Sequence, residues 1–157
     1  VLWVDGDPLC SPQLAHLGLE PLEDAFSGQT LFNLARGRRT SVKNFIMNGR
    51  IVVGIGNIYA NESLFRSGIL PSRSAGRISL NRYRRLVVAI REVLIEAIHV
   101  GGTTLRDYAT VTGEPGYFDQ ALEVYEREGR PCVRCASNIR RTIIGQRSSY
   151  FCPTCQR

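Results

Sequence analysis

Four cysteines constrain this chain more than any other feature. They form two pairs, Cys132-x2-Cys135 and Cys152-x2-Cys155, with sixteen residues between the pairs. Two such pairs supply the four thiolates of a tetrahedral zinc site, so we predict one structural zinc ion with no open position for catalysis. A disulfide framework would require an oxidising compartment and would leave Cys10 unpaired, and we therefore prefer the metal.

The segment between the cysteine pairs has the composition of a β-hairpin. β-branched residues lie on both sides of Gly145-Gln146, which is a turn candidate. A module of this size depends on its metal, because zinc contributes apparent free energies on the order of 10 to 16 kcal/mol in finger peptides. The hairpin also carries Arg140, Arg141 and Arg147. An arginine near a hairpin tip can enter a groove, lie on a phosphate or remain solvated, and we favour a role in nucleic-acid binding.

The charge of the whole chain points in the same direction. Twenty Lys and Arg residues against 14 Asp and Glu residues give a net charge of +6 and a pI of about 9.4. Such a balance favours a polyanionic partner without identifying it. No apolar run approaches the roughly 20 residues of a membrane span, and the first residues do not form a signal peptide. We expect a soluble intracellular protein without a membrane partner.

Helical periodicity dominates the region before the cysteines. Two helices are expected within residues 30–49, and Thr40 or Ser41 is the N-cap of the second. A third is expected over residues 57–67. The clearest helix follows Ser79, a natural N-cap, and ends at glycines 101 and 102. Its predicted apolar stripe consists of Leu80, Tyr83, Val87, Ile90, Leu94 and Ala97.

The first 29 residues differ from this helical region. The chain begins with the β-rich run Val1 to Val4, followed by the turn sequence Asp5-Gly6-Asp7-Pro8. An isolated strand is not stable. We therefore expect residues 1–29 to be the end of a domain missing from this sequence, together with a linker.

The stretch "VVGIGN" leaves two interpretations open. Gly54, Gly56 and Asn57 could form an ordinary turn with Asn57 as N-cap of the following helix. Alternatively, the glycines could expose backbone N–H groups to a phosphate at the helix N-terminus. The third glycine of a dinucleotide fingerprint and the Lys-Ser/Thr of a P-loop are both missing. The motif by itself favours the ordinary turn.

Five stretches, found in this order over nearly the whole chain, resemble the bacterial formamidopyrimidine-DNA glycosylases, which excise oxidised purines such as 8-oxoguanine. They are "VVGIGNIYANESLFRSGILP", "GGTTLRDY", "TGEPGYF", "VYEREGRPCVRC" and "GQRSSYFCPTCQR". The resemblance implies a mainly α fold. A helix-two-turn-helix DNA-binding domain would cover residues 30–122, and a zinc finger of the ribbon type would cover residues 123–157. The family's N-terminal β-sandwich domain would be absent.

The resemblance also implies site residues. Asn57 would hold the DNA phosphate next to the damaged nucleotide, helped by backbone N–H groups at Gly54 and Gly56. Arg147 would bind phosphate at the lesion and assist the elimination step. We assign it electrostatic stabilisation, because a guanidinium is a poor proton donor. The remaining DNA contacts implied by the resemblance are Arg39, Lys43 and Arg106.

The family's nucleophile is an N-terminal proline followed by a glutamate, and this sequence begins at Val1 without that pair. We therefore expect a bifunctional glycosylase and AP lyase for the full-length parent and no activity for these 157 residues alone. The expected partner is damaged double-stranded DNA, bound by a monomer in the bacterial cytoplasm. One alternative is an endonuclease VIII-type glycosylase for oxidised pyrimidines, against which the loop "ATVTGEPGYF" argues. Another is a non-enzymatic DNA-binding zinc-ribbon module.

Overall fold

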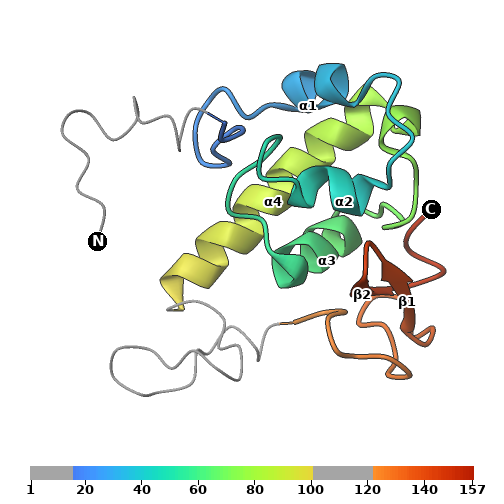
Figure 1. Ribbon diagram of the computed structural model, residues 1–157. Helices are drawn as coiled ribbons and strands as arrows, with labels where there is room; N and C mark the ends of the chain where they lie inside the picture. The colour runs from blue at the N-terminus through green and yellow to red at the C-terminus, as the bar shows by residue number, and fades with distance from the viewer. Residues whose placement is uncertain (1–15, 101–121) are drawn as a thin grey trace.

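The computed structural model describes residues 16–100 and 122–157. Helices form the first of these ranges and a two-stranded antiparallel sheet lies in the second (Figure 1). We call them the helical layer (residues 16–100) and the zinc module (residues 122–157). The elements are α1 (Gly28–Ala35), α2 (Val42–Met47), α3 (Asn57–Arg66), the short 3-10 helix η2 (Ala75–Arg77), α4 (Leu80–His99), β1 (Arg140–Ile144) and β2 (Arg147–Phe151).

The predicted strand at the start of the chain, Cys10, Arg106 and the loop "ATVTGEPGYF" lie outside the described residues. Among the helices that are described, none combines the length and the apolar character needed to cross a membrane.

Side-chain caps determine where two of the helices begin. The Ser27 Oγ accepts a hydrogen bond from the Thr30 backbone N–H at 3.1 Å, and the Ser41 Oγ accepts one from Asn44 at 3.2 Å. Of the two predicted caps for α2, Ser41 is therefore the N-cap. Ser79 occupies the N-cap position of α4 as predicted, although its side chain makes no capping hydrogen bond.

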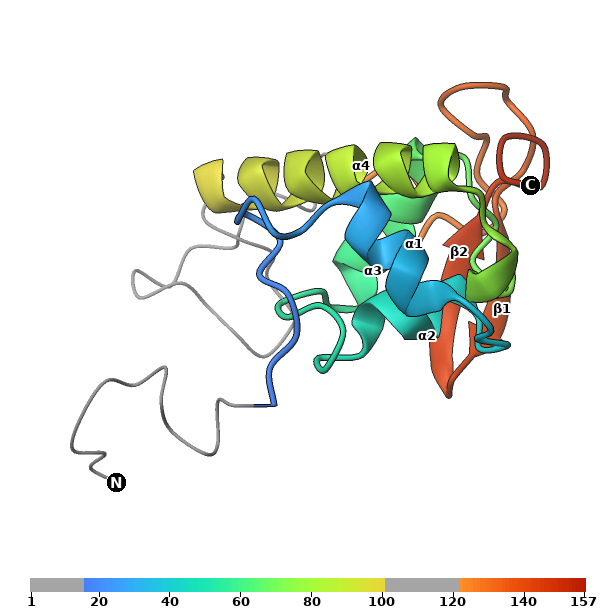
Figure 2. The same cartoon turned by 90° about the horizontal axis from the view of Figure 1, so that it is seen from above.

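The core lies where α1 and α3 pack against α4 (Figure 2). Tyr83 is fully buried at its centre, and its hydroxyl donates to the Ala75 carbonyl at 2.8 Å. Its ring stands edge-on to Phe45, with the ring centroids 6.2 Å apart. Most of the predicted stripe on α4 is buried or packed against a buried cluster. Leu80 is the exception at intermediate exposure, and the buried residues Leu86 and Val93 were missing from the prediction.

The residues before α1 also pack on the helical layer. Leu19 forms a parallel bridge with Val52, and the Gly18 N–H donates to the Gly49 carbonyl at 2.8 Å. Gly18 has no room for a side chain, because an added Cβ would lie 2.3 Å from the carbonyl carbon of Ile51. The segment from Gly18 onward is thus held by backbone pairing to the turn before α3.

The zinc module contains the predicted hairpin. Arg140 pairs with Phe151 at one end and Ile144 with Arg147 at the other. Gly145 and Gln146 both have positive φ, 57° and 63°, as a tight two-residue turn requires. An added Cβ at Gly145 would come within 2.5 Å of the Asn44 Oδ1, so the hairpin tip lies directly against α2.

Candidate zinc site and nucleic-acid interface

The four cysteines of the zinc module converge on one point. Their sulfur atoms all lie within 4.8 Å of one another. The Sγ atoms of Cys132 and Cys155 are 3.9 Å apart, and those of Cys135 and Cys152 are 3.4 Å apart. A tetrahedron with Zn–S bonds of about 2.3 Å requires sulfur separations of about 3.8 Å. The four side chains therefore fit a single zinc ion and fill its coordination sphere.

Backbone N–H groups donate to two of the four sulfurs, and the thiols differ in acidity. The N–H of Arg134 donates to the Cys132 Sγ, and the N–H of Cys155 donates to the Cys152 Sγ, both at 3.4 Å. Hydrogen bonds from Ser137 lower the pKa of the Cys135 thiol to about 6. Burial raises the pKa of Cys152. Zinc must therefore displace protons when it binds, and its affinity falls as the pH falls.

The zinc module is held to the helical layer by buried polar side chains at β2. Lys43 on α2 has no exposed surface, and its Nζ donates to the Ser148 carbonyl at 2.9 Å and to the Ser149 Oγ at 2.6 Å. The Asn57 Nδ2 donates to the same Ser148 carbonyl at 3.1 Å. The Ser148 carbonyl, which directly follows Arg147 in the chain, thus accepts hydrogen bonds from two different helices.

Asn61 completes this arrangement one helical turn after Asn57. Its side chain is buried, and its Oδ1 accepts the backbone N–H of Tyr150 at 2.7 Å. Its Nδ2 donates to the Asn57 carbonyl at 2.8 Å. We call Lys43, Asn57 and Asn61, with their partners on β2, the docking network. It fixes the backbone of β2 from Ser148 to Tyr150 against α2 and α3.

Lys43 occupies a different environment from the one expected of a phosphate contact. Its observed partners are Ser148 and Ser149, and its contact with DNA stays a prediction. Burial, with a smaller effect from the positive charge of Arg147, lowers the pKa of Lys43 to about 8. The ammonium therefore places positive charge beneath the strand that carries Arg147.

The glycine turn before α3 leaves backbone groups accessible. Gly54 has φ of +76°, and both Gly54 and Gly56 are exposed with no atom within 4 Å of an added Cβ. Gly56 is the N-cap of α3, without a side-chain cap, and Asn57 is the first helical residue. The interpretation of Asn57 as N-cap is therefore wrong. Its side chain turns to β2, and the first N–H groups of α3 have no capping side chain.

The predicted arginines differ in how firmly they are held. Arg147 is exposed at the start of β2 and has no ion pair or side-chain hydrogen bond within the described ranges. Its neighbour Arg141 is engaged, since its Nε donates to the Ser148 Oγ at 3.2 Å and its guanidinium lies 3.8 Å from the Glu128 carboxylate. Arg39 is exposed before α2 and, among the residues that the structure covers, also has no such partner.

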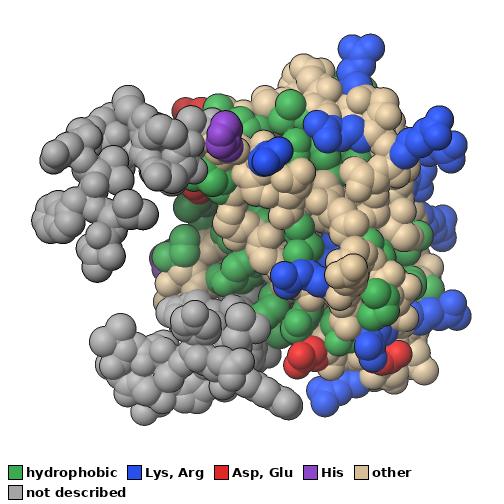
Figure 3. Space-filling view, viewed as in Figure 1, with side chains coloured by type: hydrophobic (Ala, Val, Ile, Leu, Met, Phe, Trp, Pro, Cys, Tyr) green, Lys and Arg blue, Asp and Glu red, His purple; other side chains and the backbone are tan. Residues whose placement is uncertain are grey.

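Basic side chains are numerous on the face drawn in Figure 3, and acidic ones are few. Among the described residues, the predicted cations that are exposed and have no side-chain hydrogen bond or ion pair are Arg39, Arg140 and Arg147.

Comparison with known proteins agrees with this geometry. The H2TH domain of formamidopyrimidine-DNA glycosylase matches residues 17–109, which is more than half of the chain. The zinc finger found in FPG and IleRS matches residues 129–157. The chain belongs to the formamidopyrimidine-DNA glycosylase family. This membership confirms the predicted fold class, a helix-two-turn-helix domain followed by a zinc finger, and one structural zinc ion is its cofactor.

Individual relatives show how much of the family protein is represented. The formamidopyrimidine-DNA glycosylase of Syntrophotalea carbinolica is 58% identical over 157 residues, which are 100% of this chain and 58% of the relative. That of Alkalilimnicola ehrlichii is 59% identical over 155 residues, 99% of this chain and 56% of the relative. The chain thus spans less than two thirds of the curated relatives that it matches.

Solved structures give the same result. The MutM (Fpg) protein of Thermus thermophilus superimposes with a TM-score of 0.85 at 41% identity, covering 92% of this chain and 55% of that one. The Lactococcus lactis Fpg in complex with DNA containing an abasic site gives a TM-score of 0.83 at 30% identity, covering 90% and 52%.

Two residues near this interface were not singled out from the sequence. The buried Glu62 carboxylate accepts the backbone N–H groups of residues 123, 124 and 125 at 2.9, 3.0 and 2.9 Å. Burial raises its pKa, and those N–H groups oppose the shift. The ring of Tyr125 packs edge-on against that of Tyr150, with the ring centroids 5.1 Å apart. A spacing pattern could not reveal either residue, because each pairs with a segment distant in sequence.

Proposed function

We propose that this chain grips the backbone of damaged duplex DNA as part of a glycosylase that excises oxidised purines, 8-oxoguanine and formamidopyrimidines, and then cleaves the strand as an AP lyase. The observation that carries the proposal, together with family membership, is the docking network. Asn57 and Ser148, 91 residues apart, are joined by a hydrogen bond, so that Arg147 and the glycine turn share one edge of the molecule.

The chemistry of base excision explains the value of such an edge. An enzyme that acts on a base must extrude it from the stack, which costs a few kcal/mol, and contacts to the flanking phosphates hold the distorted backbone. Asn57 and the N–H groups near Gly54 and Gly56 would supply neutral donors, and Arg147 a full charge. Arg147 would also stabilise negative charge on phosphate during elimination. Arg39 and Arg106 would extend the grip along the duplex.

The strand-cleaving step requires an amine that attacks the sugar. The family's proline is followed by glutamate, and none of the seven prolines in this sequence is followed by that residue. We therefore propose that the 157-residue chain binds duplex DNA weakly but forms no covalent adduct with it on borohydride reduction. An adduct would show that another amine of this chain reaches the sugar.

The activity is tested with the protein encoded by the complete reading frame that contains this sequence. We expect a Pro-Glu opening in that frame and cleavage of duplexes containing 8-oxoguanine. Faster cleavage of duplexes containing oxidised pyrimidines would favour the endonuclease VIII type. Failure to cleave either substrate would favour a non-enzymatic DNA-binding module.

Two further parts of the proposal concern the state of the protein. The relatives come from bacteria, and we propose that this protein acts as a monomer in the bacterial cytoplasm. Light scattering on the purified protein, with and without duplex, tests the monomer. A mass of two chains at micromolar concentration would contradict it.

A further inference from the structure

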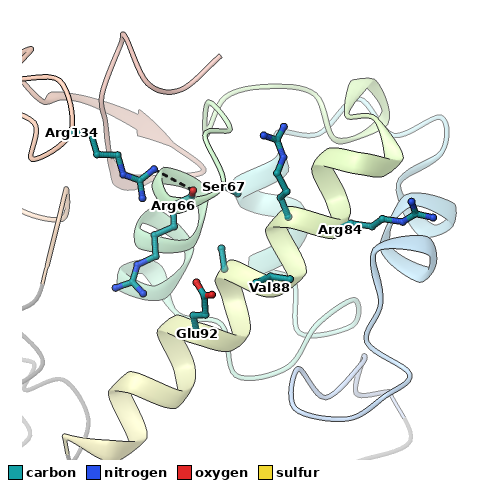
Figure 4. A pocket seen from close by; sticks show the side chains of 8 residues that line it. Arg66, Ser67, Arg84, Val88, Glu92 and Arg134 are labelled. Carbon is teal, nitrogen blue, oxygen red and sulfur yellow. Dashed lines mark hydrogen bonds between the residues drawn. The ribbon is translucent and has the colours of Figure 1, made fainter.

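A groove of about 430 Å³ lies on α4 at some distance from the docking network. The C-terminal end of α3 and Arg134 of the zinc module form its other side, and Figure 4 shows Arg134 reaching toward that end of α3. Its lining is rich in arginine and includes Arg66, Arg84, Arg85, Arg134, Val88 and Ala89. Neither the glycine turn nor Arg147 is part of it.

Arg134 is held in position in the wall of this groove. Its guanidinium carbon lies 4.4 Å from the centroid of the Phe65 ring, and its NH1 donates to the carbonyls of Phe65 and Arg66 at 3.4 and 3.3 Å. Its side chain is still 42% exposed, and its Nε forms an ion pair with the Glu123 carboxylate at 3.8 Å. A guanidinium has five N–H donors, so Arg134 keeps donors for a ligand in a fixed orientation.

The opposite wall consists of one face of α4. Arg85 is exposed and has no hydrogen-bond partner or ion pair in the part of the chain that the structure describes. Arg84 has only a long contact of 3.3 Å to the Asn81 side chain. Val88, one turn further along the helix, is 54% exposed and lies beside the buried Ala89. The lining on α4 thus combines exposed arginines with the apolar side chains of Val88 and Ala89.

The position of the groove separates it from the proposed DNA edge. Asn57 begins α3 and Arg66 ends it, and a helix of 10 residues is about 15 Å long. Glu92 on α4 also lines the groove, and Glu96 binds the Arg66 guanidinium through both carboxylate oxygens at 2.7 Å. Arg66 is thereby neutralised, so that Arg84, Arg85 and Arg134 supply the positive charge of the groove. The exposed Val88 offers no contact to a phosphate backbone, whereas it suits an aliphatic side chain of a peptide.

We propose that the groove binds an acidic peptide segment of a partner protein, with an aliphatic side chain on Val88 and flanking carboxylates on Arg85 and Arg134. Guanidinium groups bind carboxylates through two parallel hydrogen bonds, and arginine clusters are a recurring means of recognising acidic motifs. The volume suits a few residues rather than one small anion. The glycosylase would thereby be recruited by another protein while its DNA edge remains available.

The test uses a fluorescein-labelled synthetic peptide in which one leucine is flanked by two aspartates on each side. We expect saturable anisotropy with this chain and no binding of the same peptide with asparagines in place of the aspartates. Arg85→Glu should weaken binding by about tenfold, as the loss of a charge-assisted contact implies. Val88→Asp should also weaken binding, because it replaces the apolar contact for the leucine with a negative charge. Both positions are exposed, and circular dichroism confirms that the variants remain folded.

Arg77→Glu is the matched control, because Arg77 is exposed in η2, outside the groove, and the charge change is the same. It should change the peptide affinity less than twofold. Equal weakening by Arg77→Glu and Arg85→Glu, or no saturable binding, would overturn the proposal. So would displacement of the peptide by excess undamaged duplex, which would make the groove part of a DNA surface. If Arg85→Glu and Val88→Asp lose peptide binding but still bind duplex DNA, the groove and the proposed DNA edge are separate sites.

Discussion

The helical layer and the zinc module are stabilised in opposite ways. A continuous cluster of buried apolar side chains, among them Leu31, Phe45, Leu64 and Tyr83, holds the helical layer together. The zinc module contributes Val124, Ile139 and the metal ligands Cys132 and Cys152 to a small cluster that Phe65 of α3 completes. The helical layer is therefore stabilised by burial of apolar surface, whereas the fold of the zinc module depends on bound zinc.

The contact between the two regions is both apolar and polar. Phe65 of α3 is buried in one cluster with Val124 and Ile139, and Ile58 and Val93 pack with Leu122 and Tyr125 in another. Besides the docking network, Gln156 reaches from the second cysteine pair to the helical layer, and its Nε2 donates to the Ile69 carbonyl at 2.8 Å. Its Oε1 accepts the backbone N–H of Cys152 at 2.8 Å. Directional contacts of this kind fix the orientation of a small module more sharply than apolar contact does. The position of Arg147 thus depends on the metal and on these hydrogen bonds together.

Removal of zinc should have the largest effect. Chelation should unfold the zinc module, because binding contributes on the order of 10 to 16 kcal/mol in comparable modules. The helical circular dichroism should persist, because the core around Tyr83 contains no metal ligand. Native mass spectrometry should show one zinc per chain before chelation. Loss of all helical signal would contradict the division into two differently stabilised regions.

A core substitution should destabilise the helical layer and leave zinc binding intact. Leu64→Ala removes a fully buried side chain of α3 and should lower the free energy of unfolding of the helical layer by about 2 to 5 kcal/mol. Urea denaturation followed by circular dichroism measures this loss. The zinc content of the folded variant should remain one per chain, and Leu34→Ala, at an exposed position of α1, is the control. A comparable loss in the control would contradict the assignment of stability to the core.

Lys43 should make stability depend on pH. Its pKa is about 8 in the folded chain and about 10.5 without the surrounding structure. Between these values the unfolded state binds more protons, so stability should rise with pH, by at most about 3 kcal/mol over the whole window. Urea unfolding at pH 7.5 and 9.5 should show the rise in the wild type. Lys43→Met should abolish it, and persistence of the rise in that variant would assign it to another group.

How much of the fold and of the site could be predicted depends on how far apart the interacting residues are in the sequence. Ser41, the long helix after Ser79 and the cysteine pairs were recognised because their signals are local: a cap, an apolar period and a ligand spacing. Lys43 and Glu62 could not be placed in this way. Lys43 bonds to Ser148, 105 residues away, and Glu62 to Val124, 62 residues away. A single sequence does not indicate which distant strand or loop will meet a given helix face.

Substitution of Asn61 should loosen the docking without unfolding either region. Asn61→Ala leaves the Tyr150 N–H without its acceptor, at a cost of about 1 to 2 kcal/mol. Hydrogen exchange should increase at residues of β2 and remain unchanged in α4. Asn33→Ala, at an exposed site on α1, is the control. Unchanged exchange in β2 would show that Lys43 and Asn57 hold the strand without Asn61.

The finest comparison sets Asn57 on the helical layer against Arg147 on the zinc module, because both are proposed to hold the same stretch of DNA backbone. Arg147→Ala removes a charge and should reduce the slope of log affinity against log salt by roughly 0.9, the equivalent of one phosphate. Asn57→Ala removes neutral donors and should weaken binding with the slope nearly unchanged. Neither effect should depend on the sequence around the lesion, because phosphates carry no sequence information. Titration of a labelled duplex at several salt concentrations measures both quantities, with Arg130→Ala, at an exposed arginine two residues before Cys132, as control for net charge. If Arg147→Ala leaves affinity and slope unchanged, the arginine is solvated rather than bound to phosphate.

If chelation of zinc in the wild type costs far more affinity than Arg147→Ala, the hairpin holds DNA through further side chains, and Arg140 and Arg141 are the next to test.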